Sequence, residues 1–288
     1  MTSAAVVGHV EWTRIVPVEH VPSAGEIVHA GVAWQGPAGG GAIAAVQLAR
    51  LTGDCTLFTA FGDDELSARA RTELERLGVR VHAALRPERT REALSLVDVR
   101  GERMTLTLGP RLEPVARDEL PWADIGGCDT AYFAAGDTGA LRAARGATML
   151  VATARELATV LHAEVRVDAI VASLSDPAES VDCEFPMTNV PLVVITDGER
   201  GGTVRTRDGA HAGYVAALPA GPVVDCYGVG DSFAAGLTFA LGAGNDASSA
   251  VGVAARCGAA CITQRGPYGG QLDQSHLTEG AAWRGQSS

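Results

Sequence analysis

The chain contains no lysine, and all 23 of its basic side chains are arginines. A Walker A loop needs a lysine on the β- and γ-phosphates of a nucleotide, and a pyridoxal phosphate enzyme binds its cofactor through a lysine Schiff base. The sequence therefore excludes both classes. If the protein handles ATP, its anion site must be built without a lysine.

Positive charge and long apolar runs are also scarce. The net charge is −11, and a protein that binds the phosphate backbone needs a basic face, so we expect no nucleic-acid partner. No apolar run approaches the roughly 20 residues that a membrane span requires. Ala4–Val7 is apolar but short, and no basic region precedes it. We expect no signal peptide and no membrane association, and we predict a buried first strand here.

The six cysteines form no C-x-x-C pair. Cys257 and Cys261 lie four residues apart on a predicted helix, which suggests half of a metal site. No second pair of His or Cys at ligand spacing accompanies them, so packing in the core is favoured. Scattered unpaired cysteines are typical of a reducing cytosol, which predicts a cytoplasmic protein.

Short apolar runs alternate with helical patterns along most of the 288 residues. This alternation predicts an α/β fold, with a mostly parallel central sheet flanked by helices. The predicted strands are Ala4–Val10, Cys55–Ala60, Thr130–Ala134, Thr148–Ala152, Asp168–Ala172 and Leu192–Thr196. The predicted helices are Gly39–Leu51, Asp64–Leu77, Asp231–Leu241 and Ala247–Thr263.

One region lacks the intervening helices. Its predicted strands are Glu26–Trp34, Val79–Leu85, Ala93–Arg100 and Glu102–Leu108. The last two are joined at Arg100-Gly101, which indicates a hairpin, and the alternation of Leu94 and Leu96 with Ser95 indicates one wet face. We expect a small antiparallel β lid from about residues 12–36 and 79–109, whose exposed edge favours a homodimer. One domain then spans residues 1–270, and a polar tail at 271–288 frays.

The segment Val223–Leu241 carries the chemistry. A turn, Gly228-Val229-Gly230, leads into a predicted helix that begins with Asp231. Unpaired N–H groups at such a helix start and the helix dipole hold phosphate without a lysine. The carboxylate of Asp231 can accept the proton of a hydroxyl that attacks a γ-phosphate, while the N–H groups stabilise the transferring group.

Two other interpretations of this segment stay open on spacing alone. Asp231 can simply cap the helix, with the glycines making a tight turn. A dinucleotide-binding loop is disfavoured, because the segment lies near the C-terminus and lacks a following βα unit with a ribose-binding acid.

The segment resembles the second signature of the ribokinase-like (PfkB) sugar kinases, approximately D-T-x-G-A-G-D-x-F-x-A-G. Cys226 and Tyr227 depart from the usual Thr pair. The matching residues are Asp225, Gly228, Gly230, Asp231, Phe233, Ala235 and Gly236. The resemblance implies a ribokinase-like three-layer sandwich that uses ATP and Mg²⁺. It also implies Asp231 as the base, the Gly228–Gly230 turn as the anion hole, and Asp225 as a ligand of a monovalent cation such as K⁺.

Two further stretches resemble the nucleotide site of this family. Thr196, Gly198 and Gly201 match a strand that ends in T-x-G-x-x-G, which implies nucleotide binding. Glu179 matches the last residue of N-x-x-E, which implies a role in organising Mg²⁺ and phosphate, although Asp176 replaces the Asn. From the residues alone, a glycine turn and a surface acid remain alternatives. The resemblance covers about residues 4–270.

The substrate positions depart from the family pattern. Thr13 stands where the sugar-binding Asp is usual, and Ile43 where an Asn is usual. Each change removes a hydrogen bond worth roughly 0.5–1.5 kcal/mol. We therefore predict an acceptor other than plain ribose or fructose; the alternative is compensation by Glu11, Trp12 or Gln35. The predicted substrate-binding residues are Glu11, Thr13, Gly39, Gly40 and Ile43.

The sequence thus predicts an ATP-dependent phosphotransferase acting on a hydroxyl of a sugar or sugar-like molecule. The alternatives are a nucleoside or pyridoxal-type kinase on the same fold, and a degenerate, non-catalytic ligand-binding protein. The presence of Asp231 and both turn glycines argues against the last of these.

Overall fold

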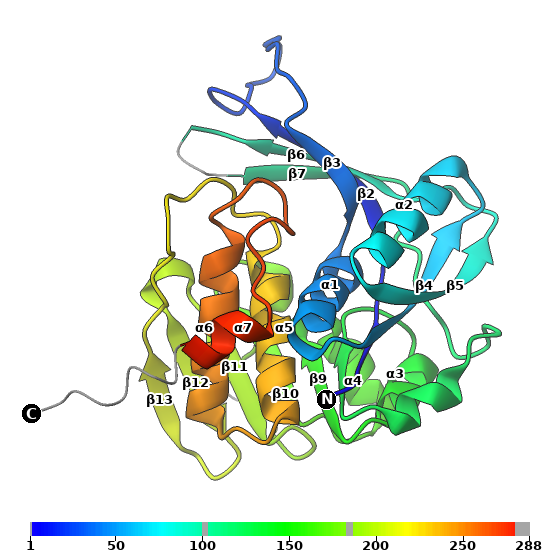
Figure 1. The fold of residues 1–288 in the computed structure, drawn as a ribbon, viewed down its shortest axis with the longest axis vertical. Coiled ribbons are helices and arrows are strands. Elements are labelled where there is room, and N and C mark those ends of the chain that lie inside the picture. Colours follow the sequence, from blue (N-terminus) through cyan, green and yellow to red (C-terminus); the bar gives the residue numbers. More distant parts are fainter. Residues whose placement is uncertain (1, 100–102, 183–186, 280–288) are drawn as a thin grey trace, which may run out of the picture.

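The central element is a nine-stranded sheet with the order β13-β12-β11-β10-β9-β8-β1-β4-β5 (Figure 1). The computed structural model describes residues 2–99, 103–182 and 187–279. The seven strands from β11 to β5 are parallel, and β12 and β13 form an antiparallel edge. The strands are β1 (Ala4–Val7), β4 (Cys55–Gly62), β5 (Val79–Arg86), β8 (Thr130–Phe133), β9 (Met149–Thr153), β10 (Ala169–Ser173), β11 (Leu192–Thr196), β12 (Gly202–Thr206) and β13 (His211–Tyr214).

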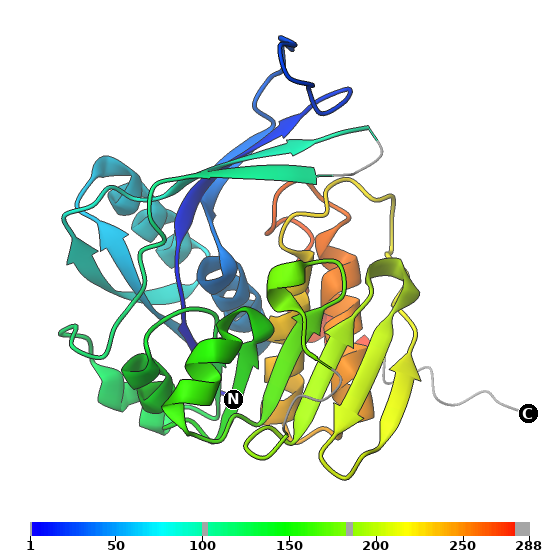
Figure 2. The same ribbon diagram turned by 180° about the vertical axis from the view of Figure 1, so that it is seen from behind.

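Helices cover both faces of this sheet, which confirms the predicted three-layer α/β class (Figures 1 and 2). The two faces hold separate cores, because successive strand residues point to opposite sides: Ala4 and Val6 enter one core, and Ala5 and Val7 the other. One core packs against α1 (Gly40–Thr52), α2 (Glu65–Arg76), α5 (Val229–Gly242) and α6 (Ala247–Cys261). The other packs against α3 (Thr138–Ala144) and α4 (Leu157–Ala163).

The two cysteines of α6, Cys257 and Cys261, are buried. The Cys261 thiol contacts the backbone carbonyls of Tyr227 and Pro267 at 3.6 and 3.5 Å. Within residues 2–99, 103–182 and 187–279, no group of three or more His, Cys, Asp or Glu side chains is arranged to hold a metal ion. These contacts support the packing interpretation of Cys257 and Cys261.

A second, smaller sheet stands over one end of the first (Figures 1 and 2). Its order is β3-β2-β6-β7, and its strands are β2 (Glu11–Pro17), β3 (Trp34–Ala38), β6 (Glu92–Val97) and β7 (Arg103–Leu108). Two antiparallel pairs, β2–β3 and β6–β7, are joined by a parallel β2–β6 pair. This is the lid. Because β1 leads into β2 after only three residues, the lid is connected directly to an interior strand of the main sheet.

The predictions of two strands for the lid are wrong. Val79–Leu85 lies in β5, which pairs in parallel with β4 at the edge of the main sheet. No strand covers Glu26–Ala33; the strand begins at Trp34 instead. The lid instead contains β2 (Glu11–Pro17), because β1 ends at Val7 rather than continuing to Val10 and a new strand begins at Glu11. Apolar runs identify strands, but they do not show to which sheet each strand belongs.

The predicted wet face of β6 is also wrong. Ala93, Ser95 and Val97 are buried, and Ser95 Oγ lies 3.2 Å from Thr105 Oγ1 of β7. Leu94 and Leu96 lie on the outer face, opposite Leu106 and Met104. Polarity misleads here because the hydroxyl of the buried Ser95 has a hydrogen-bond partner on the neighbouring strand.

At the C-terminal end, the predicted fraying tail contains a helix, α7 (Gln274–Glu279). The predicted Arg100-Gly101 turn and the tail beyond residue 279 lie outside the described residues. In the described part of the chain, the helices are too short or too polar to cross a membrane.

Candidate active site

The parallel strands end at one edge of the sheet, beneath the lid. Val7, Phe133 and Ala152 are neighbours across β1, β8 and β9, and Ser173 and Thr196 across β10 and β11. Loops at the carboxyl ends of parallel strands are the usual place for ligands in open α/β sheets. Helix α5 begins at the same edge, with Gly228 as its N-cap.

The first turn of α5 is open to an anion. Asp64, Asp137 and Asp246 cap α2, α3 and α6 by accepting a backbone N–H with their side chains. Among the described side chains, none caps α5 in this way. The N–H groups at its start therefore remain available, and the helix dipole adds positive potential there. Asp231 lies inside the first turn, so the interpretation of Asp231 as the cap is wrong.

Only glycine fits at the start of this helix. Gly228 has φ +82°, and a Cβ atom there would lie 2.9 Å from Pro267 Cβ and 3.1 Å from Ile43 Cδ1. Ile43, which the sequence placed in the substrate pocket, is fully buried and packs beneath the turn. Gly230 has open space around its Cα. Pro267 and Ile43 thus pack closely against Gly228, whereas the space beside Gly230 is open.

The carboxyl of Asp231 faces the start of α1. Its Oδ1 lies 3.1 Å from the point that a Cβ on Gly40 would occupy, and His9 Cε1 lies 3.6 Å from the same point. Withdrawal from solvent and, second to it, the negative charge of Glu179 raise the pKa of Asp231 to about 7, against the opposing charges of Arg103 and Arg155. A carboxylate with a pKa near neutral is suited to accept a proton.

Two residues that depart from the family pattern, Thr13 and Tyr227, contact each other. Tyr227 is buried, its hydroxyl donates to Glu11 Oε1 at 3.2 Å, and it lies 3.2 Å from Thr13 Oγ1. Thr13 stands where an Asp is usual, and Tyr227 where a Thr is usual. Sequence reasoning noted both changes but missed that the side chains meet. Their pairing ties the anion-binding turn to the lid.

Asp225 holds the same turn. Its two carboxylate oxygens accept the N–H groups of Tyr227 at 2.8 Å and Gly266 at 3.0 Å, and the side chain is buried. These contacts account for a buried carboxylate without any ion. The assignment of Asp225 to a monovalent cation stays a prediction.

Arg155 is a candidate site residue that the sequence did not reveal. Its Nη2 donates to Glu179 Oε1 at 3.1 Å, and the same guanidinium pairs with Asp176. Burial raises the pKa of Glu179, and Arg155 lowers it. Asp176 also accepts the N–H of Ala178, at the start of the short 3₁₀ helix Pro177–Glu179. Glu179 is therefore held in place at the carboxyl end of β10.

The predicted nucleotide residues lie together in the turn between β11 and β12. Thr196 ends β11, and its hydroxyl donates to the Ala172 carbonyl at 3.2 Å. Gly198 and Gly201 both have positive φ, and a Cβ on Gly201 would fall 2.0 Å from the Tyr214 carbonyl oxygen. The turn thus requires glycine and presents its backbone at the same sheet edge as Asp231.

A family model described as "pfkB family carbohydrate kinase" matches residues 1–135 and 134–274. The chain belongs to the PfkB family of carbohydrate kinases. This confirms the resemblance drawn from the sequence, and it makes the protein a kinase.

Known kinases resemble the chain along nearly its whole length. The ATP-dependent ribose-1-phosphate kinase of Halopiger xanaduensis is 30% identical over 283 residues, which cover 90% of this chain and 91% of the relative. Among solved structures, adenosine kinase from Sinorhizobium meliloti has a TM-score of 0.79 at 19% identity, covering 97% and 99% of the two chains. Arabidopsis thaliana ribokinase, complexed with ribose and ATP, has a TM-score of 0.74 at 16% identity, covering 97% and 98%. At these identities the two structures establish the fold.

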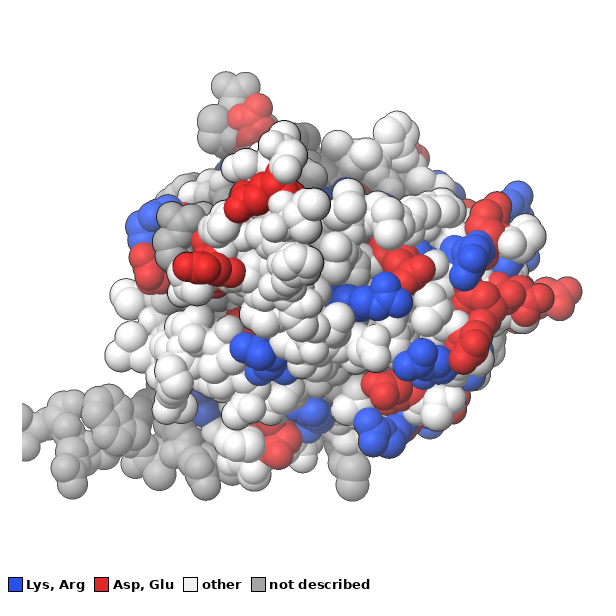
Figure 3. All heavy atoms as spheres, turned by 90° about the horizontal axis from the view of Figure 1, so that it is seen from above, with Lys and Arg blue, Asp and Glu red and all other residues white. Residues whose placement is uncertain are grey.

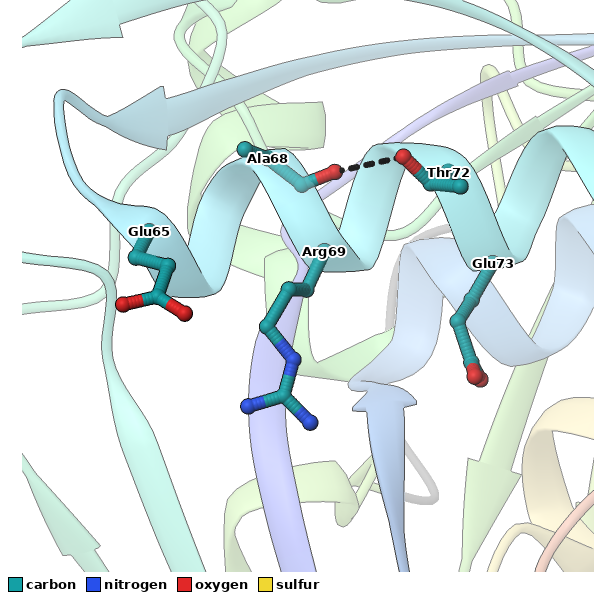
Figure 4. Close-up of a pocket in the computed structure, with 5 residues that line it drawn as sticks. All are labelled: Glu65, Ala68, Arg69, Thr72 and Glu73. Carbon is teal, nitrogen blue, oxygen red and sulfur yellow. Dashed lines mark hydrogen bonds between the residues drawn. The ribbon is translucent and has the colours of Figure 1, made fainter.

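A separate hollow of about 340 Å³ lies beside α2 in this kinase (Figure 4). It is lined by Glu65, Ala68, Arg69, Thr72 and Glu73. The Arg69 guanidinium lies 4.6 Å over the ring of Trp12, which it helps to bury. No predicted site residue lines this hollow, so it is not the active site.

Proposed function

We propose that this kinase transfers the γ-phosphate of ATP to a hydroxyl of a sugar or sugar-like molecule, with Asp231 as the general base and the Gly228–Gly230 turn as the anion hole. One observation carries the proposal: the uncapped first turn of α5 also contains a carboxyl whose pKa lies near 7. An anion site and a base in one turn suit phosphoryl transfer to an alcohol.

In the proposed reaction, the residues of the turn have different roles. The acceptor hydroxyl gives its proton to Asp231, and its oxygen forms a bond to the γ-phosphorus. The bond between that phosphorus and the β–γ bridging oxygen breaks, and ADP leaves with the electron pair. The N–H groups of Val229, Gly230 and Asp231 stabilise the charge on the transferring group.

The nucleotide is assigned to the β11–β12 turn, with Thr196, Gly198 and Gly201. Mg²⁺ would neutralise phosphate charge, and Glu179 would hold one of its bound waters, because Mg²⁺ keeps several waters in such sites. The ion pair of Glu179 with Arg155, whose side chains are 26% and 37% exposed, supports a fixed carboxylate in this position. A K⁺ ion near Asp225 and a cytoplasmic location both stay predictions.

The acceptor would bind between the lid and α1, against Glu11, Thr13, Gly39 and Gly40. Thr13 is already engaged by Tyr227, and Ile43 supports Gly228, so neither offers a free hydrogen bond to a sugar. The names of the relatives point to ribose 1-phosphate, ribose and adenosine as acceptors. A nucleoside kinase is accordingly the second candidate.

An acceptor panel tests this proposal. The purified protein is given ATP-Mg²⁺ with ribose, fructose, ribose 1-phosphate, adenosine or pyridoxal, and ADP release is measured. We expect turnover, with neither ribose nor fructose as the best acceptor. A preference for ribose would contradict the pocket assignment, and a lack of turnover with every acceptor would favour a non-catalytic binding protein.

We also propose that the kinase forms a homodimer through its lid. Met104, Leu106 and Leu108 on the edge strand β7 are 45%, 54% and 55% exposed on its outer face. Figure 3 looks onto the lid end, where a broad area carries no charged side chain. An exposed apolar patch on an edge strand favours pairing with a second copy.

Leu106→Asp is expected to convert the dimer into a monomer, because it places a charge in the apolar contact. Light scattering after size exclusion at micromolar concentration measures the mass. Leu161→Asp is the control, since Leu161 is 51% exposed on α4, away from the lid. A monomeric wild type, or equal masses of the two variants, would contradict the lid interface.

A further inference from the structure

His9 is a polar residue of the site to which the proposed reaction gives no role. It lies in the three-residue connection between β1 and β2. Its carbonyl accepts the N–H of Gly41, in the first turn of α1, at 3.2 Å. This hydrogen bond fixes the backbone of His9 against the start of that helix.

The imidazole of His9 and the carboxyl of Asp231 border the same space. A Cβ on Gly40 would lie 3.6 Å from His9 Cε1 and 3.1 Å from Asp231 Oδ1. A Cβ on Gly39 would lie 3.0 Å from His9 Nε2. Because both positions are glycines, no side chain from the start of α1 fills the space that these two groups share.

The two ring nitrogens of His9 differ in their surroundings. Within the described residues neither nitrogen has a hydrogen-bond partner, and Nδ1 is also buried. Buried N–H groups without an acceptor are rare in folded proteins, so the proton of the neutral ring belongs on Nε2. Nε2 is therefore a free hydrogen-bond donor at the ring edge that faces Gly39 and the space beside Asp231.

The imidazole stays neutral in the physiological pH range. Its pKa is lowered to about 3, by burial first and then by the positive charges of Arg111, Arg91 and Arg155. Since the pKa of Asp231 is about 7, the carboxylate and not His9 takes up a proton released in this space. The neutral ring can still donate one hydrogen bond.

We propose that His9 binds the acceptor, with its Nε2–H donating to a second hydroxyl close to the one that is phosphorylated. The reacting hydroxyl gives its proton to Asp231 and needs its lone pair for phosphorus, so an N–H bond to the same oxygen would weaken the nucleophile. His9 thus supplies a hydrogen bond that Thr13 and Ile43 do not offer. This inference rests on the proposed function, since it names the acceptor class of the same site, a compound with two neighbouring hydroxyls.

His9→Asn and His9→Gln distinguish the two ring nitrogens. The amide nitrogen of asparagine can take the place of Nδ1, and that of glutamine the place of Nε2, so only glutamine keeps the donor. For the best acceptor, kcat/KM should fall about 10-fold in His9→Asn, as expected for one hydrogen bond, and less than 3-fold in His9→Gln. Calorimetry should show the same ATP affinity in both. Equal losses in the two variants would overturn the assignment of Nε2.

Deoxy acceptors give a result that a purely structural role of His9 would not produce. Adenosine, ribose and ribose 1-phosphate are each compared with their 2-deoxy and 3-deoxy counterparts. The wild type should lose about 10-fold in kcat/KM on the counterpart that lacks the hydroxyl bound by His9. His9→Asn should lose almost nothing more on that counterpart, because the same hydrogen bond is already absent.

His162→Asn is the matched control, because His162 lies on α4 and bonds to the Ala158 carbonyl of its own helix. It should behave as the wild type with every acceptor. If His9→Asn loses the same factor on all acceptors, deoxy or not, His9 does not bind a hydroxyl, and the kinase assignment stands. If the wild type turns over no acceptor, the proposed function fails, and this inference fails with it.

Discussion

Asp231→Asn is expected to lower kcat by about 10²–10⁴-fold, the usual contribution of a general base. The amide cannot accept the proton of the acceptor hydroxyl, whereas the N–H groups of the first turn of α5 remain. The dissociation constant of ATP should therefore change little. Steady-state kinetics with the best acceptor and calorimetry with ATP measure the two effects. A variant that keeps its kcat would contradict the assignment of the base.

The same carboxyl predicts a pH dependence. Because the pKa of Asp231 is raised to about 7, kcat/KM of the wild type should rise with pH and level off above 7, as the base loses its proton. In Asp231→Asn this rise should disappear. A wild-type profile already flat between pH 5 and 8 would rule out a base with a pKa near neutral.

The stability of the folded protein should fall as the pH rises, whereas kcat/KM should increase. In the unfolded chain Asp231 has its ordinary pKa of 3.8, so the folded state holds the proton more tightly. The contribution of this group to stability is full below pH 4 and falls as the pH rises toward 7. Asp231→Asn should therefore have a higher Tm than the wild type at pH 8, which a thermal melt measures. A large drop in Tm would indicate a structural role instead.

Gly228→Ala is expected to lower kcat by about 10²–10³-fold, the usual effect of losing an anion-hole donor. The backbone there has φ +82°, and the new Cβ would meet Pro267 at 2.9 Å and Ile43 at 3.1 Å. The turn must shift, and the N–H groups that face the phosphate shift with it. Steady-state kinetics measure kcat, and circular dichroism measures the folded fraction to which kcat is normalised.

Gly244→Ala is the control for backbone strain. Gly244 has the same φ of +82°, but a Cβ there meets nothing within 4 Å, and the residue follows the far end of α5. It should lose about 1–2 kcal/mol of stability, the usual penalty of a left-handed residue, and keep its kcat. Equal activity losses in both variants would show that strain alone, and not the anion hole, explains Gly228→Ala.

Local patterns predicted the main sheet well and the lid poorly. Leu192–Thr196 was predicted with its observed bounds, because a short apolar run between turns is buried on both faces. Val79–Leu85 was a correctly predicted strand in the wrong sheet, since pairing partners lie far away in the sequence. Ser95 was predicted to be wet, but it is buried, because the polarity of a side chain does not show which face of a sheet is covered.

The sequence by itself determined the kinase signature and the anion-binding turn with Asp231, because a glycine turn that enters a helix is built from consecutive residues. Only the tertiary structure decided what surrounds that turn. Tyr227 meets Thr13, 214 residues away, and Arg91 forms an ion pair with Glu11, 3.8 Å away. Such contacts depend on how sheet and lid fold together. The contacts around the proposed acceptor site, unlike the consecutive residues of the proposed catalytic turn, can therefore be recognised only in the tertiary structure.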